Sequence, residues 1–168
     1  MYGGRVWKDD PGPEAYGAVD EAVSSLGVVR ALASSPLAER VLQLERDLFV
    51  VGAELATAPE KRSKLVDGIS LTTVAMVERL EAEIDRVVAE HPLPQEFIVP
   101  GENPLEAALE VARATVRRAE RRVTTYARAG GLTDSQVPVY LNRLADLLYV
   151  LARSVAPTWQ PTRPKEDS

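Results

Sequence analysis

Apolar residues recur at three- and four-residue spacing along most of the 168-residue chain, which is the pattern of amphipathic helices. The periodicity predicts five helices: one from near Pro13, then Pro36–Ala56, Ser70–Glu90, Pro104–Ala129, and a last one that follows Thr133 or Ser135 and includes Tyr140–Ser154. No segment has a convincing strand pattern. Because the connections are short, we predict an all-α fold, an antiparallel five-helix bundle forming a single domain over residues 1–155.

Residues 1–12 are rich in glycine and proline and predict an irregular arm, and three later segments also fall outside the predicted helices. Thr57–Ile69 is polar and contains a proline and a glycine, so we expect a mobile surface loop. His91–Pro104 is a connector with four prolines. Residues 156–168 hold three prolines and many charges, and we expect a disordered tail there.

The fourth predicted helix carries five arginines within ten residues: Arg113, Arg117, Arg118, Arg121 and Arg122. Arg113 and Arg117, with Arg121 at the edge, form a stripe that borders the apolar face instead of lying opposite it. Like charges four residues apart repel by roughly 0.2–0.5 kcal/mol per pair, so a solvated helix gains nothing from this stripe. An anionic ligand or partner carboxylates would explain it, because guanidinium forks suit phosphate and carboxylate. The alternative is a solvated face whose arginines pair with Glu106, Glu110 and Glu120.

Other polar and aromatic residues stand where they need a partner. Asp20 lies on or beside the apolar face of the first helix, and an acidic group near a buried face requires one. Asn142 and Asp146 share a face of the fifth helix, so Asp146 and its neighbour Arg143 are natural partners for charges on the fourth. Phe97 opens the segment FIVPGENP in the connector, where it either anchors the loop in the core or is exposed to a ligand.

Composition excludes several kinds of site. The formal net charge is −5, and an acidic chain with one basic helix fits a local anion site better than nucleic-acid binding. There is no cysteine, so disulfides and thiolate chemistry are excluded, and the single histidine, His91, rules out a multi-histidine metal site. No signal peptide or membrane-spanning apolar run is present. We therefore expect a cytoplasmic protein that binds neither membrane nor nucleic acid.

Five segments together carry a family resemblance. They are AYGAVDE (Ala15–Glu21), DLFVVGAELAT (Asp47–Thr57), FIVPG (Phe97–Gly101), VARATVRRAERR (Val111–Arg122) and YLNRLADLLYVLAR (Tyr140–Arg153). In this order the segments resemble the ATP:cob(I)alamin adenosyltransferases of the PduO type. The resemblance covers about residues 3–155, and its last two segments are the most specific.

This resemblance implies a five-helix bundle assembled as a homotrimer, with active sites between neighbouring subunits. ATP binds with Mg²⁺, and a corrinoid such as cobalamin binds with its lower axial base displaced. Cobalt(II) is reduced to cobalt(I) by an electron from a reductase, and cobalt(I) attacks the 5′ carbon of ATP. The products are triphosphate and the adenosylated corrinoid, which an adenosylcobalamin-dependent enzyme can receive.

Residue by residue, the resemblance implies the following roles. Lys8 matches a lysine that contacts the ATP phosphates, and Asn142 an asparagine that contacts ATP. Asp20 and Arg113 match a salt bridge between subunits, and Phe97 matches an aromatic residue near the lower face of the corrinoid. The ATP-binding segment is matched by four residues, Arg117, Arg118, Glu120 and Arg121. Because the nucleophile is cobalt itself, no serine, cysteine or histidine catalyst is required.

The chain departs from the family pattern in two ways. The family begins with an arm of the type threonine–arginine–threonine–glycine–aspartate that wraps the triphosphate, whereas this sequence starts at Met1 inside the following segment. Because every downstream motif remains, we prefer a misplaced start over a truncated, impaired protein. Glu102 and Glu110 stand where the family has glycine and histidine, and they add negative charge near the expected phosphate site.

Two other functions stay open at this point. The first is a non-catalytic bundle of the same fold that binds a corrinoid or a partner protein. The second is a plain helical oligomer whose arginines make only salt bridges. ATP binding separates the enzyme from both, and a cobalt(II) absorbance shift on corrinoid binding separates the two alternatives from each other.

Overall fold

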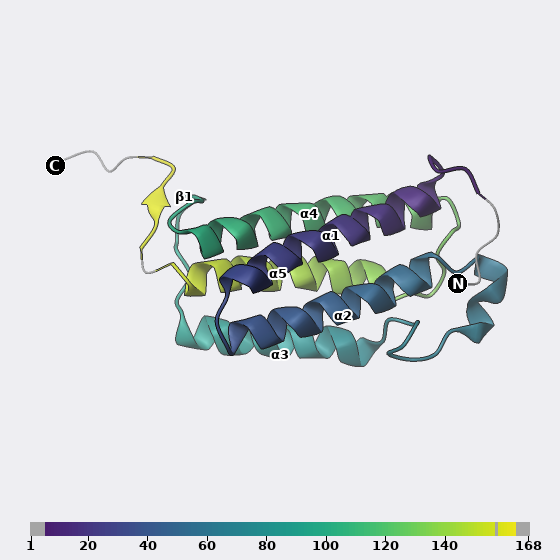
Figure 1. Ribbon diagram of the computed structural model, residues 1–168, viewed down its shortest axis with the longest axis horizontal. Helices are drawn as coiled ribbons and strands as arrows, with labels where there is room; N and C mark the ends of the chain where they lie inside the picture. The colour runs from purple at the N-terminus through teal and green to yellow at the C-terminus, as the bar shows by residue number, and fades with distance from the viewer. Residues whose placement is uncertain (1–5, 157, 164–168) are drawn as a thin grey trace.

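The computed structural model describes residues 6–156 and 158–163, most of which are helical (Figure 1). Five α-helices follow along the chain: α1 (Pro11–Leu32), α2 (Leu37–Leu55), α3 (Val74–Glu90), α4 (Pro104–Arg128) and α5 (Val137–Ser154). Successive helices run in opposite directions along the long axis of the molecule (Figure 1). The structure therefore confirms the predicted all-α, antiparallel five-helix bundle.

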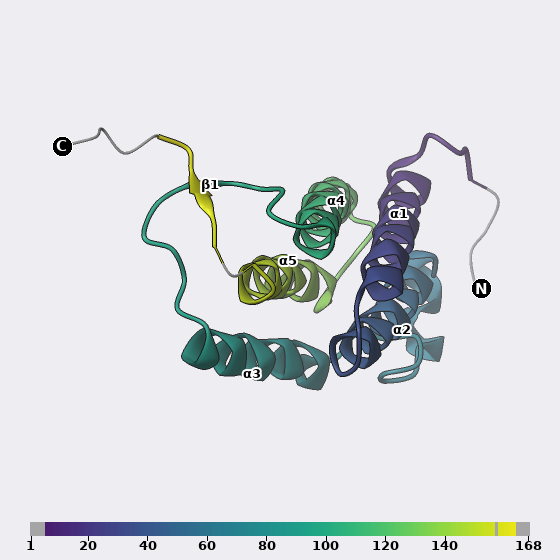
Figure 2. The same ribbon diagram turned by 60° about the vertical axis from the view of Figure 1, so that its left-hand side comes forward.

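The core lies where the apolar faces of the five helices meet (Figure 2). Helix α1 packs against α2 and α4, and helix α5 packs against α4 and α3. The predicted leucine face of α5 is confirmed, since its leucines are at most 2% exposed: Leu141, Leu144, Leu147, Leu148 and Leu151. Full burial of one such side chain stabilises a fold by about 1.5–3 kcal/mol. None of the helices in the described part of the chain is both long and apolar enough to cross a bilayer.

Local capping moves some helix ends away from their predicted places. Helix α1 starts at Pro11, two residues before the predicted Pro13. Helix α3 starts at Val74 instead of Ser70, because Thr73 caps it and its hydroxyl oxygen accepts a hydrogen bond from the Met76 amide at 3.3 Å. Apolar spacing continues across such a boundary, so periodicity alone does not locate it.

The expected mobile loop after α2 is instead organised around a buried carboxylate. Residues Pro59–Lys64 form the 3₁₀-helix η1. Glu54 of α2 is 0% exposed, and its carboxylate accepts hydrogen bonds from Arg62 at 2.8 Å, from the Thr72 amide at 2.7 Å and from the Ser135 hydroxyl at 2.6 Å. A buried carboxylate is stable only when its oxygens are bonded in this way. The Glu54 carboxylate thus ties the loop to the starts of α3 and α5.

Within the predicted disordered tail, residues 158–163 include a strand, and residues 157 and 164–168 lie outside the described part of the chain. Gln160–Pro161 (β2) pairs antiparallel with Ile98–Val99 (β1) in the connector between α3 and α4. The Thr162 amide adds a hydrogen bond to the Phe97 carbonyl oxygen at 2.9 Å. Polar composition predicted disorder, but it carries no information about pairing with a segment sixty residues away. The connector between α3 and α4 and strand β2 after α5 form one substructure at the end of the bundle (Figure 2).

Candidate active site

Helix α4 presents its arginines to the surface because the apolar face beside them is completely buried. The residues of that face are all 0% exposed: Leu109, Ala112, Val116, Ala119 and Val123. Asn103 caps the helix by accepting a hydrogen bond from the Glu106 amide at 2.9 Å, and the interior contains no glycine or proline. The arginine side chains therefore project from a rigid helix whose rotation is fixed by the core.

Of the arginines Arg117, Arg118, Arg121 and Arg122 on α4, two are engaged with α1. Arg118 forms an ion pair with Glu21, and Arg122 lies 3.5 Å from a carboxylate oxygen of Glu14. All four side chains are about half exposed, so these are surface ion pairs worth about 0–1 kcal/mol each. They bind α4 to α1 laterally and occupy the two guanidiniums.

Arg117 and Arg121 are different. Both are exposed, and neither forms an ion pair with any residue that the structure describes. They lie four residues apart, so their side chains share one side of α4. Two neighbouring guanidiniums without carboxylate partners repel each other and can bind an anion such as phosphate.

Asn142 on α5 and Glu120 on α4 lie beside Arg117 and Arg121, and we call these four residues the arginine surface. The Asn142 side-chain amide on α5 donates a hydrogen bond to the Glu120 carboxylate on α4 at 3.1 Å. Both side chains are partly buried, so the contact lies between α4 and α5. The structure thus brings four of the residues singled out in the sequence, Arg117, Arg121, Glu120 and Asn142, onto one surface.

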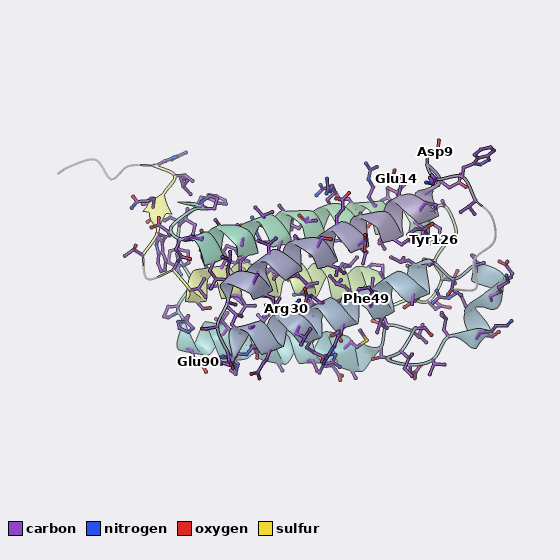
Figure 3. The ribbon with its side chains drawn as sticks, in the orientation of Figure 1. Asp9, Glu14, Arg30, Phe49, Glu90 and Tyr126 are labelled. Carbon is purple, nitrogen blue, oxygen red and sulfur yellow. The ribbon has the colours of Figure 1, made fainter. Side chains whose placement is uncertain are left out.

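Lys8 lies at the same end of the bundle as the second half of α4. It is exposed, in a turn closed by a hydrogen bond from the Asp10 amide to the Trp7 carbonyl oxygen at 3.2 Å. The turn leads directly into α1, and Figure 3 shows Glu14, the partner of Arg122, near the start of that helix. Lys8 is therefore near this end of the arginine surface, without a contact to it.

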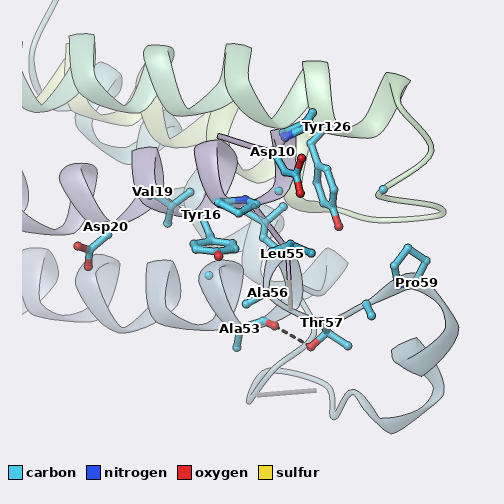
Figure 4. A pocket seen from close by; sticks show the side chains of 18 of the residues that line it. Asp10, Tyr16, Val19, Asp20, Ala53, Leu55, Ala56, Thr57, Pro59 and Tyr126 are labelled. Atoms are coloured by element: carbon cyan, nitrogen blue, oxygen red, sulfur yellow. Dashed lines mark hydrogen bonds between the residues drawn. The ribbon is translucent and has the colours of Figure 1, made fainter. Parts of the chain in front are cut away.

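Asp20 and Arg113 do not meet within the chain. Asp20 is exposed on the side of α1 that faces α2 (Figure 4). Arg113 donates to Glu110 at 2.8 Å and stacks over Tyr149 of α5, with 5.9 Å between the guanidinium carbon and the ring centroid. The two side chains thus lie on opposite sides of the α1–α4 pair. A salt bridge between them requires a second copy of the chain.

Phe97 lies in the connector at the opposite end of α4 from Arg121. Its side chain is 88% exposed, which excludes the loop anchor in the core that the sequence left open. From Pro104 to Arg117 the helix rises by about 20 Å. Within one chain Phe97 and the arginine surface are therefore separate, and only bound molecules or a second chain can connect them.

A large cavity between α1 and α2 was not expected from the sequence (Figure 4). Its volume is about 1000 Å³, and its wall is mostly apolar with Tyr16 and Tyr126 at the sides. Burial raises the pKa of Tyr126, while nearby Arg62 lowers it. The available signal was a run of small residues on the facing helices, including Gly12, Gly17 and Gly52.

Sequence reasoning also missed the polar groups that are buried around the site. Arg153 is 2% exposed and bonds Glu106, which is 0% exposed, and Glu110 at 2.7 Å. Burial and the adjacent Asp47 carboxylate raise the pKa of Tyr140, whose hydroxyl donates to Asp47 at 3.1 Å. These residues interrupt apolar stripes, and such interruptions were the signal in the sequence.

Known proteins resemble this chain over nearly its whole length. The family model for cobalamin adenosyltransferase matches residues 1–155. A corrinoid adenosyltransferase of Citrobacter freundii is 39% identical over 155 residues, covering 91% of this chain and 86% of that protein. A corrinoid adenosyltransferase of Mycobacterium leprae (strain TN) is 37% identical over 166 residues, covering 94% of this chain and 86% of that protein.

Solved structures show the same fold. A variant PduO-type ATP:corrinoid adenosyltransferase from Lactobacillus reuteri, complexed with cobalamin and ATP, superposes with a TM-score of 0.81 at 29% identity, covering 95% of this chain and 90% of that chain. A second variant of that enzyme, complexed with ATP, also has a TM-score of 0.81 at 29% identity, covering 94% and 90%. The family match, the identities and the shared bundle agree with the resemblance seen in the sequence, and the chain belongs to the cobalamin adenosyltransferase family.

Proposed function

We propose that this protein is an ATP:corrinoid adenosyltransferase that moves the 5′-deoxyadenosyl group of ATP onto cobalt(I) of cobalamin. The cobalt–carbon bond forms with the electron pair of cobalt(I), the bond between C5′ and the phosphate oxygen breaks, and triphosphate leaves. The observation that carries the proposal is the pair of exposed arginines, Arg117 and Arg121, beside the Asn142–Glu120 contact, in a chain of this family.

The arginine surface is proposed to bind the triphosphate. Negative charge accumulates on the leaving triphosphate as the C5′–oxygen bond breaks, and preorganised guanidinium donors stabilise that charge. Arg117 and Arg121 supply such donors without having to break an existing ion pair within the described chain. Arg118 would first have to break its ion pair with Glu21, so we assign it a lesser role in binding the triphosphate. Lys8 is proposed to contact the phosphates from the turn before α1.

Asn142 is proposed to contact ATP while Glu120 holds its amide group. The Asn142 amide has a second N–H and an oxygen that can reach a nucleotide when the first N–H is bonded to Glu120. Glu120 therefore orients Asn142 on the arginine surface.

Phe97 is proposed to occupy the lower face of the corrinoid. Cobalt(II) is reduced to cobalt(I) more easily when it has no lower axial ligand, and an apolar ring excludes both water and the displaced base from that position. The exposure of Phe97 supports this role. In addition, the phenylalanine and the arginine that are varied in the Lactobacillus reuteri structures are as far apart in that sequence as Phe97 and Arg117 are here.

Mg²⁺ is proposed to arrive with ATP. No group of three or more acidic or histidine side chains that could hold a metal ion occurs among the residues that the structure describes. This fits Mg²⁺, which commonly binds substrate phosphates with only one or two carboxylates. The protein residues would then bind the magnesium–triphosphate unit through the arginines.

A homotrimer with sites between subunits is proposed from the placement of Asp20 and Arg113. Both are accessible, they face different directions on one chain, and their charges are opposite. In a closed ring each chain offers Asp20 to one neighbour and Arg113 to the other. Light scattering should give about 55 kDa, three times the 18.3 kDa chain mass, and Asp20→Arg should lower it. A wild-type monomer at micromolar concentration would contradict the shared site.

A cytoplasmic location is proposed from the substrates and partners of the proposed reaction. ATP, a reductase that supplies the electron, and an adenosylcobalamin-dependent enzyme that receives the product would all be encountered in the cytoplasm.

The decisive experiment is to incubate the protein with MgATP and chemically reduced cobalamin. The adenosylated product should be detected by its light-sensitive absorbance, and triphosphate should appear in equal amount. If cobalamin binds and shifts the cobalt(II) spectrum but no product forms, the protein is a non-catalytic corrinoid-binding bundle. If neither ATP nor corrinoid binds, the arginines make only structural contacts.

A further inference from the structure

The exposed Phe97 side chain is positioned by its backbone. With 88% of its surface exposed, Phe97 has little packing to hold it in one place. The backbone around it is bonded at two points. The Phe97 carbonyl oxygen accepts from the Thr162 amide at 2.9 Å, and the Gly101 amide donates to a Glu106 carboxylate oxygen at 2.7 Å. These two bonds enclose strand β1 (Ile98–Val99).

The hydrogen bond from the Gly101 amide to the Glu106 carboxylate is unusual for a glutamate at this position of a helix. Glu106 is the third residue of α4, from which a glutamate side chain normally bonds the backbone of the capping residue, here Asn103. Instead it reaches two residues further back, to Gly101, whose φ of 120° is one that residues with side chains rarely adopt. The carboxylate therefore holds the connector in addition to the helix end.

Arg153 fixes the Glu106 carboxylate from the other side. The two side chains are 0% and 1% exposed, and the guanidinium bonds the carboxylate oxygen that does not face Gly101. Screening by water and side-chain freedom, which weaken surface ion pairs, are absent at such burial. The Glu106 carboxylate thus connects the Gly101 amide to Arg153 of α5 through a buried contact.

The same guanidinium continues the network towards the arginine surface. Arg153 also bonds Glu110 at 2.7 Å, and Glu110 bonds Arg113 at 2.8 Å, one helical turn before Arg117. The Tyr149 ring lies against both guanidiniums, at 5.4 Å from Arg153 and 5.9 Å from Arg113. The negative charges of Glu106 and of Glu110, the latter unexpected for the family, are therefore balanced by the two guanidiniums of Arg153 and Arg113.

We propose that Glu106 and Arg153 are positioning residues for Phe97, and that Glu110 links them to Arg113, one helical turn before Arg117 on α4. This inference rests on the proposed function of Phe97. One buried network would then fix the positions of both Phe97 and Arg113 relative to the same helix, α5. Thr162 supplies the second, exposed anchor of the Phe97 backbone.

The principal test compares Glu106→Gln with Glu54→Gln. Glu54 is the matched control, because it is equally buried, bonded to an arginine and to a backbone amide, and lies at the other end of the bundle. Both variants should lower the melting temperature. Only Glu106→Gln should lower turnover, by about tenfold or more, and reduce the four-coordinate cobalt(II) signal formed with ATP and cobalamin, while the Kd for ATP stays within about twofold.

A second pair of variants avoids the core. Thr162→Pro removes the amide that bonds the Phe97 carbonyl oxygen, and Thr162→Val retains that amide. Because Thr162 is exposed, neither change disturbs the bundle. Thr162→Pro should reduce the four-coordinate signal, and Thr162→Val should leave it unchanged.

Phe97→Ala, measured in parallel, separates failure of this inference from failure of the proposed function. If the wild-type protein forms no four-coordinate cobalt(II) and no product, the proposed function is wrong. If Phe97→Ala removes the signal but folded Glu106→Gln retains it as Glu54→Gln does, the positioning role is overturned and the function stands. If Glu106→Gln does not fold, the two Thr162 variants decide, and equal signals from both overturn the proposal.

Discussion

The two parts of the candidate site are positioned in opposite ways. The arginine surface stands on α4, where the helix itself is fixed by a face of residues that are all 0% exposed. Phe97 stands on a connector, where backbone hydrogen bonds from Thr162 and to Glu106 replace side-chain packing. The position of a side chain on a packed helix is set by the residues around it. The position of a side chain on a loop is set by the contacts that hold the loop backbone. Substitutions on the arginine surface should therefore have local effects, and the Phe97 segment should respond to distant changes.

The largest expected effect is on ATP binding by Arg117→Ala. Losing one charge-assisted contact to a buried phosphate costs roughly 1.5–3 kcal/mol, or roughly 10- to 150-fold in Kd. The melting temperature should barely change, because the substitution relieves repulsion with Arg113 and Arg121. Calorimetric titration with MgATP would measure this. Unchanged ATP affinity together with a large loss of thermal stability would identify Arg117 as structural.

Phe97→Ala should affect the other substrate. Turnover should fall about tenfold or more, because cobalt(II) would keep an axial ligand, whereas ATP affinity should stay near that of the wild type. Stability should fall by far less than the roughly 3–5 kcal/mol of a buried phenylalanine, since the ring is 88% exposed. Ile69→Ala, 72% exposed in the loop before α3, is the control for loss of an exposed apolar group. Equal effects of both variants on the cobalt(II) spectrum would remove Phe97 from the site.

Asn142→Ala should have an intermediate effect on ATP binding. A single neutral hydrogen bond contributes roughly 0.5–1.5 kcal/mol, so the Kd should rise by roughly 2- to 13-fold. Loss of the amide also leaves Glu120 without its hydrogen-bond partner on α5. Asn142→Asp, which places a second carboxylate beside Glu120, should weaken ATP binding more than alanine does. The opposite ranking would show that Asn142 does not face the phosphates.

The smallest effect should come from Arg118→Ala, because Arg118 faces α1. Its ion pair with Glu21 is half exposed, so the free energy of unfolding should change by less than about 1 kcal/mol. ATP affinity should fall less than for Arg117→Ala. Urea unfolding and the same calorimetric titration would measure both quantities. If Arg118→Ala weakens ATP binding as strongly as Arg117→Ala, the distinction between paired and unpaired arginines on α4 is wrong.

The sequence predicted what depends on local spacing. Five helices, the leucine face of α5 and the stripe of Arg113, Arg117 and Arg121 all follow from periodicity, because an amphipathic helix records its buried face in its own sequence. The shared surface of Asn142 and Glu120 required the structure, since it depends on how α4 and α5 pack. The catalytic and binding roles of these residues remain predictions.

Contacts between distant segments were outside the reach of periodicity. The β1–β2 pairing and the Thr162 contact to Phe97 join segments separated by an entire helix pair. From the sequence, Glu110 is interpreted as an unfavourable charge near a phosphate site. Sequence spacing does not reveal that Arg153 approaches it from α5. A buried polar pair depends on two residues that are distant in the sequence, and the sequence around either one does not identify its partner.

The Glu54 carboxylate has a consequence for how the bundle opens. Arg62, the Thr72 amide and the Ser135 hydroxyl all release their bonds if this one carboxylate is freed. The 59–72 loop and the turn before α5, which are remote from each other in the chain, should therefore exchange their amide hydrogens as one cooperative unit, with a single opening free energy. Native-state hydrogen exchange should place the amides of the 59–72 loop and of the turn before α5 in the same group, and Glu54→Gln should raise their exchange rates together.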